Sequence, residues 1–313
     1  MKNIHVYRSI DIDEINNLFK NISYKIVDIA EQRYNDELKN VVNLVMNNFS
    51  KYKIILLAGP SASGKTTTAK LLQNALRASG IGAWVISLDD FFWGKDCMPK
   101  NGMGQLDYES INSLDLDLVH KCLEELILTS SSEFPIFDFI KDTRSEFKRL
   151  IKISDGDILI LEGLHALNPE LMLPSYIDKC LKVYVSVSTS YVKEEKTIMK
   201  PSELRLIRRI IRDNKFRNTS PYETLKLWPF VCEGEQKYID PFKESAKIFI
   251  DSCLSYEPFI FNNYIVELLN MIDKSDLRYE EILNVSHKLT YFKNIDSSTV
   301  PINSILREFI GLT

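Results

Sequence analysis

The sequence lacks the features of a secreted protein, of a protein stabilised by a structural metal ion, and of a membrane-spanning protein. Its five cysteines are scattered and form no C-x-x-C pair, so we interpret them as reduced core thiols rather than as zinc ligands or disulfides. No window approaches the roughly 18 apolar residues of a membrane-spanning helix. The N-terminus "MKNIHVYRSIDIDE" has no apolar signal region. We therefore expect a soluble, cytoplasmic protein with no membrane partner.

An excess of charge of one sign is also missing. The formal net charge is −4 over 313 residues, which argues against a broad nucleic-acid surface. No repeat or low-complexity segment stands out. With 45% hydrophobic and 26% charged residues, the chain can bury a sizeable core, as one large domain or one domain with appendages. Composition leaves open whether several copies assemble into a homo-oligomer.

Five short runs rich in β-forming residues alternate with helical patterns after residue 52. They cover residues 53–58, 82–88, 157–163, 181–187 and 246–252. This alternation predicts an α/β fold with three layers, in which helices cover both faces of a mainly parallel sheet. Residues 11–49 have a helical pattern, and so do "FIFNNYIVELLNMI", "RYEEILNVSHKLTYF" and "INSILREFI". We predict one α/β domain at 51–255 with helical extensions at 1–50 and 256–313.

The stretch "GPSASGKT" fits the phosphate-loop pattern G-x-x-x-x-G-K-S/T at every fixed position. Gly59 and Gly64 allow the backbone to wrap closely, so that its N–H groups and a helix N-terminus face phosphates. Lys65 brings a positive charge to the outer phosphates, and the Thr66 hydroxyl is placed to coordinate Mg²⁺. The same phosphate site is expected to include Ser61, Ser63 and Thr67.

An acidic pair follows the second predicted strand, in "VISLDDFFWG". No N-K-x-D guanine-reading motif and no LSGGQ-like transporter signature occurs in the chain. A carboxylate at the carboxyl edge of the sheet can orient an acceptor hydroxyl and take its proton, as a small-molecule kinase requires. We assign this role to Asp89, with a helix cap or a turn acid as the alternative. For Asp90, the cap or turn acid is the favoured interpretation.

A second acid ends the apolar run in "LILEGLHAL". The pattern is typical of a buried parallel strand that carries Glu162 at its tip, where this side chain could hold Mg²⁺ through a water. A structural salt bridge is the alternative. His165 lies nearby, and we assign it no role, because a lone histidine is usually a packed or surface residue.

A predicted helix in "ELRLIRRIIRDNKFR" carries four arginines at helical spacing. Arg205, Arg208, Arg209 and Arg212 fall at i, i+3, i+4 and i+7, and therefore on one face. Among neighbours in sequence, only Glu203 and Asp213 could neutralise them. Since like charges at this spacing destabilise a helix, an anionic ligand is a better explanation than a solvated face. Arginines over a transferring phosphoryl group would stabilise its charge.

Taken in order, these motifs resemble those of the uridine kinase and phosphoribulokinase family of P-loop kinases. The resemblance covers about residues 53–252, through "GPSASGKTTTA", "SLDDFF", "FDFIKDTR", "LILEGLHAL" and "RLIRRIIRDNKFR". It implies a P-loop NTPase-type fold with a lid at about 200–220. It also implies ATP with Mg²⁺ as donor and a sugar hydroxyl as acceptor, the 5′ position for a nucleoside.

The resemblance also implies roles for individual residues. Asp89 matches the catalytic aspartate, assisted by Lys65 and Arg212. Asp107 matches the acid that holds the ribose hydroxyls. On the acceptor side the family pattern further implies Phe137, Phe139, Arg144 and Arg209, whereas Arg212 and Arg217 match arginines that reach the ATP phosphates.

Several base-reading positions depart from the family pattern. Asp142 stands where a base-contacting histidine is usual, and Phe137 replaces a tyrosine. Thr219 replaces a second lid arginine, and Leu227 stands at an expected glutamine. Because a carboxylate only accepts hydrogen bonds, Asp142 would favour an acceptor that offers N–H or O–H groups, unless it pairs with Arg144 or Lys141.

Three functions remain open from the sequence. The first is an ATP-dependent nucleoside kinase. The second is the same phosphoryl transfer to another sugar or alcohol, such as a pentose phosphate or a pantothenate-like molecule. The third is a nucleotide-binding regulatory protein whose helical extensions engage a partner.

Overall fold

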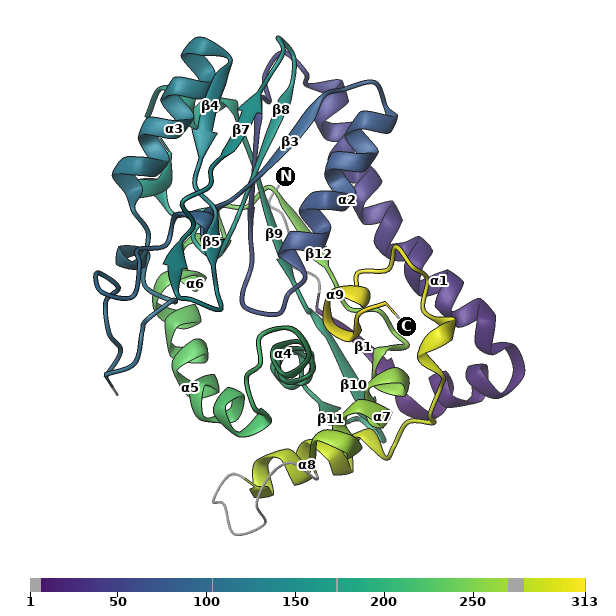
Figure 1. Ribbon diagram of the computed structural model, residues 1–313. Coiled ribbons are helices and arrows are strands. Elements are labelled where there is room, and N and C mark those ends of the chain that lie inside the picture. Colours follow the sequence, from purple (N-terminus) through teal and green to yellow (C-terminus); the bar gives the residue numbers. More distant parts are fainter. Residues whose placement is uncertain (1–6, 103, 173, 270–278, 313) are drawn as a thin grey trace.

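The centre of the molecule is a five-stranded parallel sheet, seen in a computed structural model that describes residues 7–102, 104–172, 174–269 and 279–312 (Figure 1). Its strand order is β12-β9-β2-β8-β3. The strands are β2 (Ile54–Ala58), β3 (Ala83–Ser87), β8 (Ile158–Glu162), β9 (Cys180–Ser186) and β12 (Ile248–Asp251). Each lies within two residues of a run predicted from the sequence. The predicted α/β fold with a mainly parallel sheet is therefore confirmed.

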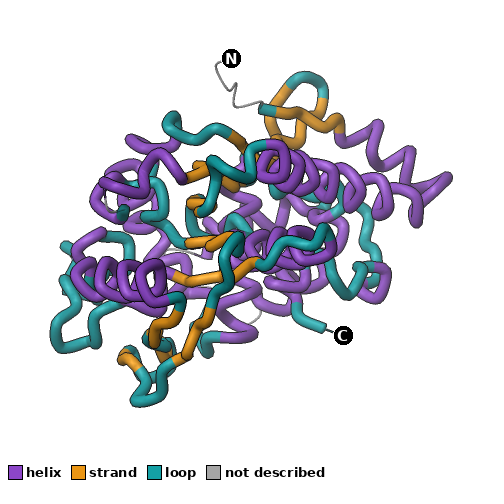
Figure 2. The backbone as a smooth tube through the Cα atoms, turned by 90° about the horizontal axis from the view of Figure 1, so that it is seen from above, coloured by secondary structure: helices purple, strands orange, loops and turns teal. Residues whose placement is uncertain are grey.

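Helices cover both faces of this sheet, as Figure 2 shows from above. Every residue of β2 and β8 is buried, as expected for strands covered on both sides. One apolar core joins the sheet to α1 (Ile12–Asn47), α2 (Lys65–Ala78), α4 (Pro201–Phe216), α7 (Glu257–Leu269), α8 (Tyr279–Leu289) and α9 (Arg307–Ile310). The opposite core includes α3 (Leu116–Thr129). Helix α5 (Pro221–Tyr238) packs beside α4, and α6 (Asp240–Lys243) follows it.

The N-terminal extension is one long helix preceded by a short strand. Helix α1 has 36 residues and begins where the Asp11 side chain accepts the Glu14 N–H at 2.9 Å. The Tyr34 hydroxyl lies 2.6 Å from the Thr68 hydroxyl of α2. The extension therefore packs directly behind the phosphate loop.

Three smaller sheets were not predicted. Strands β1 (Arg8–Asp11) and β10 (Thr189–Lys193) are parallel, and β11 (Lys196–Met199) is antiparallel to β10. The other two are antiparallel pairs, β4 (Ser131–Phe134) with β7 (Arg149–Lys152) and β5 (Phe137–Asp138) with β6 (Thr143–Arg144). These strands are short and largely polar, so they lack the apolar runs by which the central strands were recognised.

The C-terminal helices agree with the prediction in α7 and α8, whereas the last one is confined to Arg307–Ile310. Residues 270–272 of the predicted helix at 259–272 lie outside the described residues. The boundaries at 50 and 255 stay a prediction. Within the described ranges, no helix is both long and apolar enough to cross a membrane.

Candidate active site

The phosphate loop connects the buried strand β2 to the start of α2, and its glycines are required by close contacts. A Cβ atom on Gly59 would lie 2.0 Å from the Val185 carbonyl oxygen. Gly64 has φ +85°, a left-handed conformation that favours glycine, and its Cβ would lie 2.3 Å from Ile305. Both glycines thus allow the loop to fold tightly against β9 and the C-terminal segment.

Lys65 and Thr66 stand at the N-terminus of α2, next to the acid at the end of β8. The Thr66 hydroxyl donates to Glu162 Oε1 at 3.2 Å, and the Ser87 hydroxyl donates to the same oxygen at 2.8 Å. Burial and the neighbouring charge of Asp89 raise the pKa of Glu162 to about 7. Burial also lowers the pKa of Lys65, against the opposing effect of Glu162. The predicted pair of Thr66 and Glu162 is therefore in contact.

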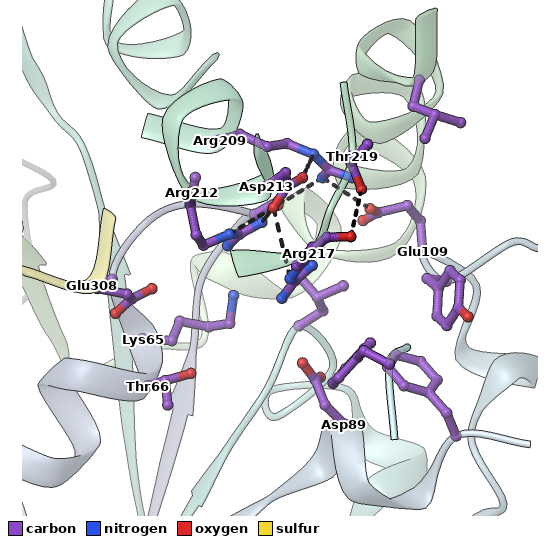
Figure 3. A pocket seen from close by; sticks show the side chains of 18 of the residues that line it. Lys65, Thr66, Asp89, Glu109, Arg209, Arg212, Asp213, Arg217, Thr219 and Glu308 are labelled. Atoms are coloured by element: carbon purple, nitrogen blue, oxygen red, sulfur yellow. Dashed lines mark hydrogen bonds and ion pairs between the residues drawn. The ribbon is translucent and has the colours of Figure 1, made fainter. Parts of the chain in front are cut away.

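A cavity of about 410 Å³ opens in front of this loop (Figure 3). Lys65 and Thr66 project toward it from α2 and Asp89 from the turn after β3, and the arginines of α4 face them. Its other lining residues are Ser61, Ala62, Gly64, Phe92, Tyr108, Glu109, Phe139, Asp142, Leu164, Arg209, Arg212, Asp213, Arg217, Thr219, Leu227 and Glu308. The cavity therefore brings together the phosphate loop, the carboxylate of Asp89 and several aromatic side chains.

The two acids after β3 have different surroundings. Asp89 lines the cavity. Asp90 points away: its Oδ1 accepts the Phe137 N–H at 3.1 Å, and its Oδ2 lies 3.5 Å from Arg149. Only Asp89 is therefore placed to meet a bound molecule, and Asp90 has the structural role favoured from the sequence.

Three arginines of the predicted lid surround one buried carboxylate. Asp213 lies 3.2 Å from Arg209 Nε, 2.7 Å from Arg212 Nη2 and 3.7 Å from Arg217 Nε. Burial acts against ionisation, but the three guanidiniums leave the pKa of Asp213 below its ordinary value. Glu109 also lies 3.9 Å from Arg209, so three positive charges meet two negative ones, and the remaining positive charge suits phosphate groups.

The prediction that all four arginines of α4 bind one anionic ligand is wrong for Arg205 and Arg208, which pair with acids of the protein. Arg208 is fully buried and pairs with Glu257, with Nε–Oε2 and Nη2–Oε1 distances of 2.8 and 2.5 Å. Arg205 Nη2 lies 2.7 Å from Glu235. These partners are 49 and 30 residues away in sequence, so neighbours along the helix could not reveal them.

Part of the cavity lining is aromatic, namely Phe92, Tyr108 and Phe139. The ring centroids of Phe92 and Tyr108 lie 5.1 Å apart. Phe139 lies 5.0 Å from Phe137, which is not among the described lining residues. The Arg217 guanidinium lies 5.0 Å from the Phe139 ring centroid. This aromatic part of the lining offers apolar surface to a flat or ring-shaped group.

Asp142 pairs with neither of its suggested partners. Its Oδ1 accepts the Tyr108 hydroxyl at 2.5 Å, whereas Lys141 lies 3.7 Å from Asp138 and Arg144 lies 2.9 Å from Asp115. The alternative that paired it with Arg144 or Lys141 is therefore wrong. The backbone of Asp142 is left-handed, with φ +50°.

The family pattern assigns Asp107 and Arg144 to the acceptor, and in the structure both side chains bond to other groups of the protein. Asp107 Oδ1 accepts the N–H groups of Glu109 and Ser110 at 3.0 and 3.2 Å. Arg144 donates to the carbonyl oxygens of Phe91 and Phe92 besides its ion pair. Neither is among the described lining residues of the cavity. Their roles toward an acceptor stay predictions.

Sequence reasoning missed several residues of the site. Ser87 ends β3 two positions before Asp89, a place in the chain that could have suggested a role. Tyr108 and Glu109 follow Asp107 immediately. Glu308 gave no local signal, because it contacts Thr67 from 241 positions away.

Comparisons with known protein sequences agree with the motifs. Residues 54–256 match the model of the "Phosphoribulokinase / Uridine kinase family". A uridine kinase of Bacillus pumilus is 30% identical over 202 residues, covering 64% of this chain and 87% of the relative. A uridine kinase of Ureaplasma urealyticum is 26% identical, covering 62% and 86%.

Solved structures are also similar to this chain. A possible uridine kinase from Bacillus stearothermophilus is 20% identical with a TM-score of 0.47, covering 69% of this chain and 98% of its own. A phosphoribulokinase from Rhodobacter spheroides is 17% identical with a TM-score of 0.43, covering 82% and 98%.

Proposed function

The chain belongs to the phosphoribulokinase / uridine kinase family of ATP-using P-loop kinases, and we propose that it phosphorylates the 5′-hydroxyl of a uridine- or cytidine-like nucleoside. One observation carries the proposal: Lys65, Thr66 and Asp89 share a cavity with the aromatic side chains of Phe92 and Phe139. A phosphate donor and a ring-bearing acceptor could therefore lie side by side, with an acid at their junction.

The chemistry follows from this arrangement. Asp89 accepts the proton of the acceptor hydroxyl, whose oxygen forms a bond to the terminal phosphorus while the bond to the departing ADP oxygen breaks. Lys65, Arg212 and Arg217 stabilise the negative charge on the phosphates. Arginines over the cavity also exclude water, which would otherwise compete as acceptor.

Thr66 and Glu162 would hold Mg²⁺, Glu162 through a water. When bound there, Mg²⁺ would neutralise part of the phosphate charge. In the described part of the chain, no group of three or more His, Cys, Asp or Glu side chains could form a metal cage. Mg²⁺ typically uses one or two protein oxygens together with phosphates, so this sparse site fits it. The raised pKa of Glu162 marks a buried carboxylate that a divalent cation would stabilise.

A second candidate is the same transfer to another sugar or alcohol, and three lining residues favour it. Asp142 is engaged by Tyr108. Thr219 and Leu227 line the cavity at positions where the family pattern has an arginine and a glutamine. The base-reading contacts and one lid position of the family would therefore be altered, while Lys65, Arg212 and Arg217 are kept.

An acceptor panel tests the proposal. We expect ADP release with Mg-ATP to be stimulated most by uridine or cytidine, and mass spectrometry with ³¹P NMR to identify the 5′-monophosphate. The same assay is run with other nucleosides, pentose phosphates and small alcohols. Turnover restricted to the last two groups would replace the nucleoside with the second candidate. Tight ATP binding without stimulation by any acceptor would indicate the regulatory protein instead.

A further inference from the structure

The acceptor side contains a carboxylate that the family pattern does not assign, and we infer that Glu109, rather than Asp107, accepts hydrogen bonds from the hydroxyl groups of a neutral acceptor. This inference rests on the proposed function and names a specificity-determining residue for it. It follows from the different surroundings of two acids that are two positions apart.

The carboxylate of Asp107 stabilises the backbone turn that directly follows this residue. Its Oδ1 accepts two backbone N–H groups, from Glu109 and Ser110, and the Ser113 hydroxyl donates to its backbone carbonyl. These bonds fix the direction in which the following side chains leave the backbone. Asp107 therefore positions Glu109.

Glu109 reaches the cavity but lacks a full set of partners. Its side chain is 12% exposed, and Oε1 lies 3.9 Å from Arg209 Nη1 (Figure 3). Oε2 is buried and has no hydrogen-bond partner among the described residues. Burial raises the pKa of Glu109 to about 7, against the opposing charge of Arg209. Hydroxyl groups of a ligand would supply the missing donors.

Helix α5 leaves room for this side chain. A Cβ atom on Gly234 would lie 2.4 Å from Glu109 Cβ, so a larger residue there would displace Glu109. Asp89 and Asp142 line the same cavity as Glu109. Three acids in this lining disfavour an acceptor that already carries a phosphate.

The test is a set of matched variants in acceptor kinetics. Glu109→Gln keeps the size of the side chain, and we expect it to raise KM for the acceptor about 10- to 100-fold with KM for ATP unchanged. Gly234→Ala, which moves Glu109 without removing its charge, should raise the same KM. Asp107→Asn retains the oxygen that accepts the Glu109 and Ser110 N–H groups, so it should raise the acceptor KM less than Glu109→Gln does.

The outcomes separate this inference from the proposed function. Wild-type turnover combined with an unchanged acceptor KM in Glu109→Gln overturns the role of Glu109 alone. An increased KM in Asp107→Asn only would return the role to Asp107. If no acceptor stimulates the wild type, the proposed function fails and the inference fails with it.

A different observation carries a second inference: we propose that the carboxylate of Glu308 occupies a nucleotide-phosphate position and has to leave when ATP binds. Glu308 Oε2 accepts both the backbone N–H of Thr67, at 3.2 Å, and the Thr67 hydroxyl, at 2.6 Å. Thr67 lies in the first turn of α2, where N–H groups have no partner within the helix. Phosphates bind such N–H groups. One N–H group cannot donate a good hydrogen bond to the Glu308 carboxylate and to a phosphate at the same time.

The segment that carries Glu308 also contacts the lid. Lys215 of α4 donates to the Ile310 carbonyl oxygen, and the Phe309 ring lies 4.8 Å from the Arg208 guanidinium. Residues 304–311 therefore connect the phosphate loop to α4 (Figure 1). Loss of the Glu308 contact would loosen this connection when the nucleotide enters.

Two measurements test the second inference. We expect Glu308→Gln to lower Kd for ATP about 3- to 10-fold, with Glu267→Gln, an exposed position on α7, as the matched control. A non-hydrolysable ATP analogue should speed amide hydrogen exchange in residues 304–311 of the wild type. Weaker or unchanged ATP binding in Glu308→Gln, or slower exchange in this segment, would mean that the segment does not compete with the nucleotide.

Discussion

Replacement of Asp89 by asparagine is expected to lower kcat by about 10²- to 10⁴-fold, the usual contribution of a positioned general base. Asparagine has nearly the same size and can still accept a hydrogen bond from the acceptor hydroxyl, but it cannot take its proton. Because Asp89 stands across the cavity from the phosphate loop, the affinity for ATP should stay unchanged. Steady-state kinetics together with calorimetric ATP binding measure the two quantities separately.

The adjacent residue provides the control. Asp90 has the same chemistry one position later, but its carboxylate is bound to the Phe137 N–H and to Arg149. Asp90→Asn can keep the first of these bonds, so its kcat should stay close to that of the wild type. Normal turnover in Asp89→Asn would contradict the assignment, and equal losses in both variants would indicate a structural effect of the turn.

The sequence was most informative where one segment contains all the necessary information. The central strands were recognisable because buried parallel strands are continuous apolar runs. The phosphate loop was recognisable because its glycines, Lys65 and Thr66 act within eight consecutive residues. Strands β1, β10 and β11 are short and mostly polar, and their pairing depends on partners far away in the chain, so no local pattern predicted them.

The acceptor side shows the limit of reasoning from a family pattern. Asp107 matches a substrate-binding acid of the family, and the sequence did not show that its carboxylate also accepts the Glu109 N–H. Asp142 aligned with a base-reading position, yet its partner is Tyr108. In both cases the residue type was known and its nearest donor was not, because that donor is fixed by the tertiary structure.

The arginines of α4 show that the charged partners of buried side chains are also not predictable from a local pattern. Helical spacing predicted that they share one face, but a local count of charges found too few acids. Glu257 and Glu235 supply the missing charges from other helices. The same helix thus contains both structural arginines and arginines that face the cavity, and a stability measurement can distinguish them.

Replacement of Glu257 by glutamine is expected to lower the free energy of unfolding by about 3–5 kcal/mol, the usual effect of breaking a buried ion pair. Arg208 and Glu257 are both fully buried, so the variant leaves an uncompensated guanidinium out of reach of water. Glu257 also accepts the Leu254 N–H at 2.7 Å, and glutamine can keep only part of this bonding. Urea unfolding followed by circular dichroism measures the loss.

Asp36→Asn is the matched control, because it neutralises one partner of an exposed pair with Lys39 on α1. Exposed pairs contribute little to stability, so this variant should unfold with the wild type. If Glu257→Gln kept wild-type stability and instead weakened ATP binding, Arg208 would face the nucleotide, as the helical spacing alone suggested. A large loss of stability in Glu257→Gln only would place Arg208 in the core and leave Arg209, Arg212 and Arg217 as the arginines available to phosphate.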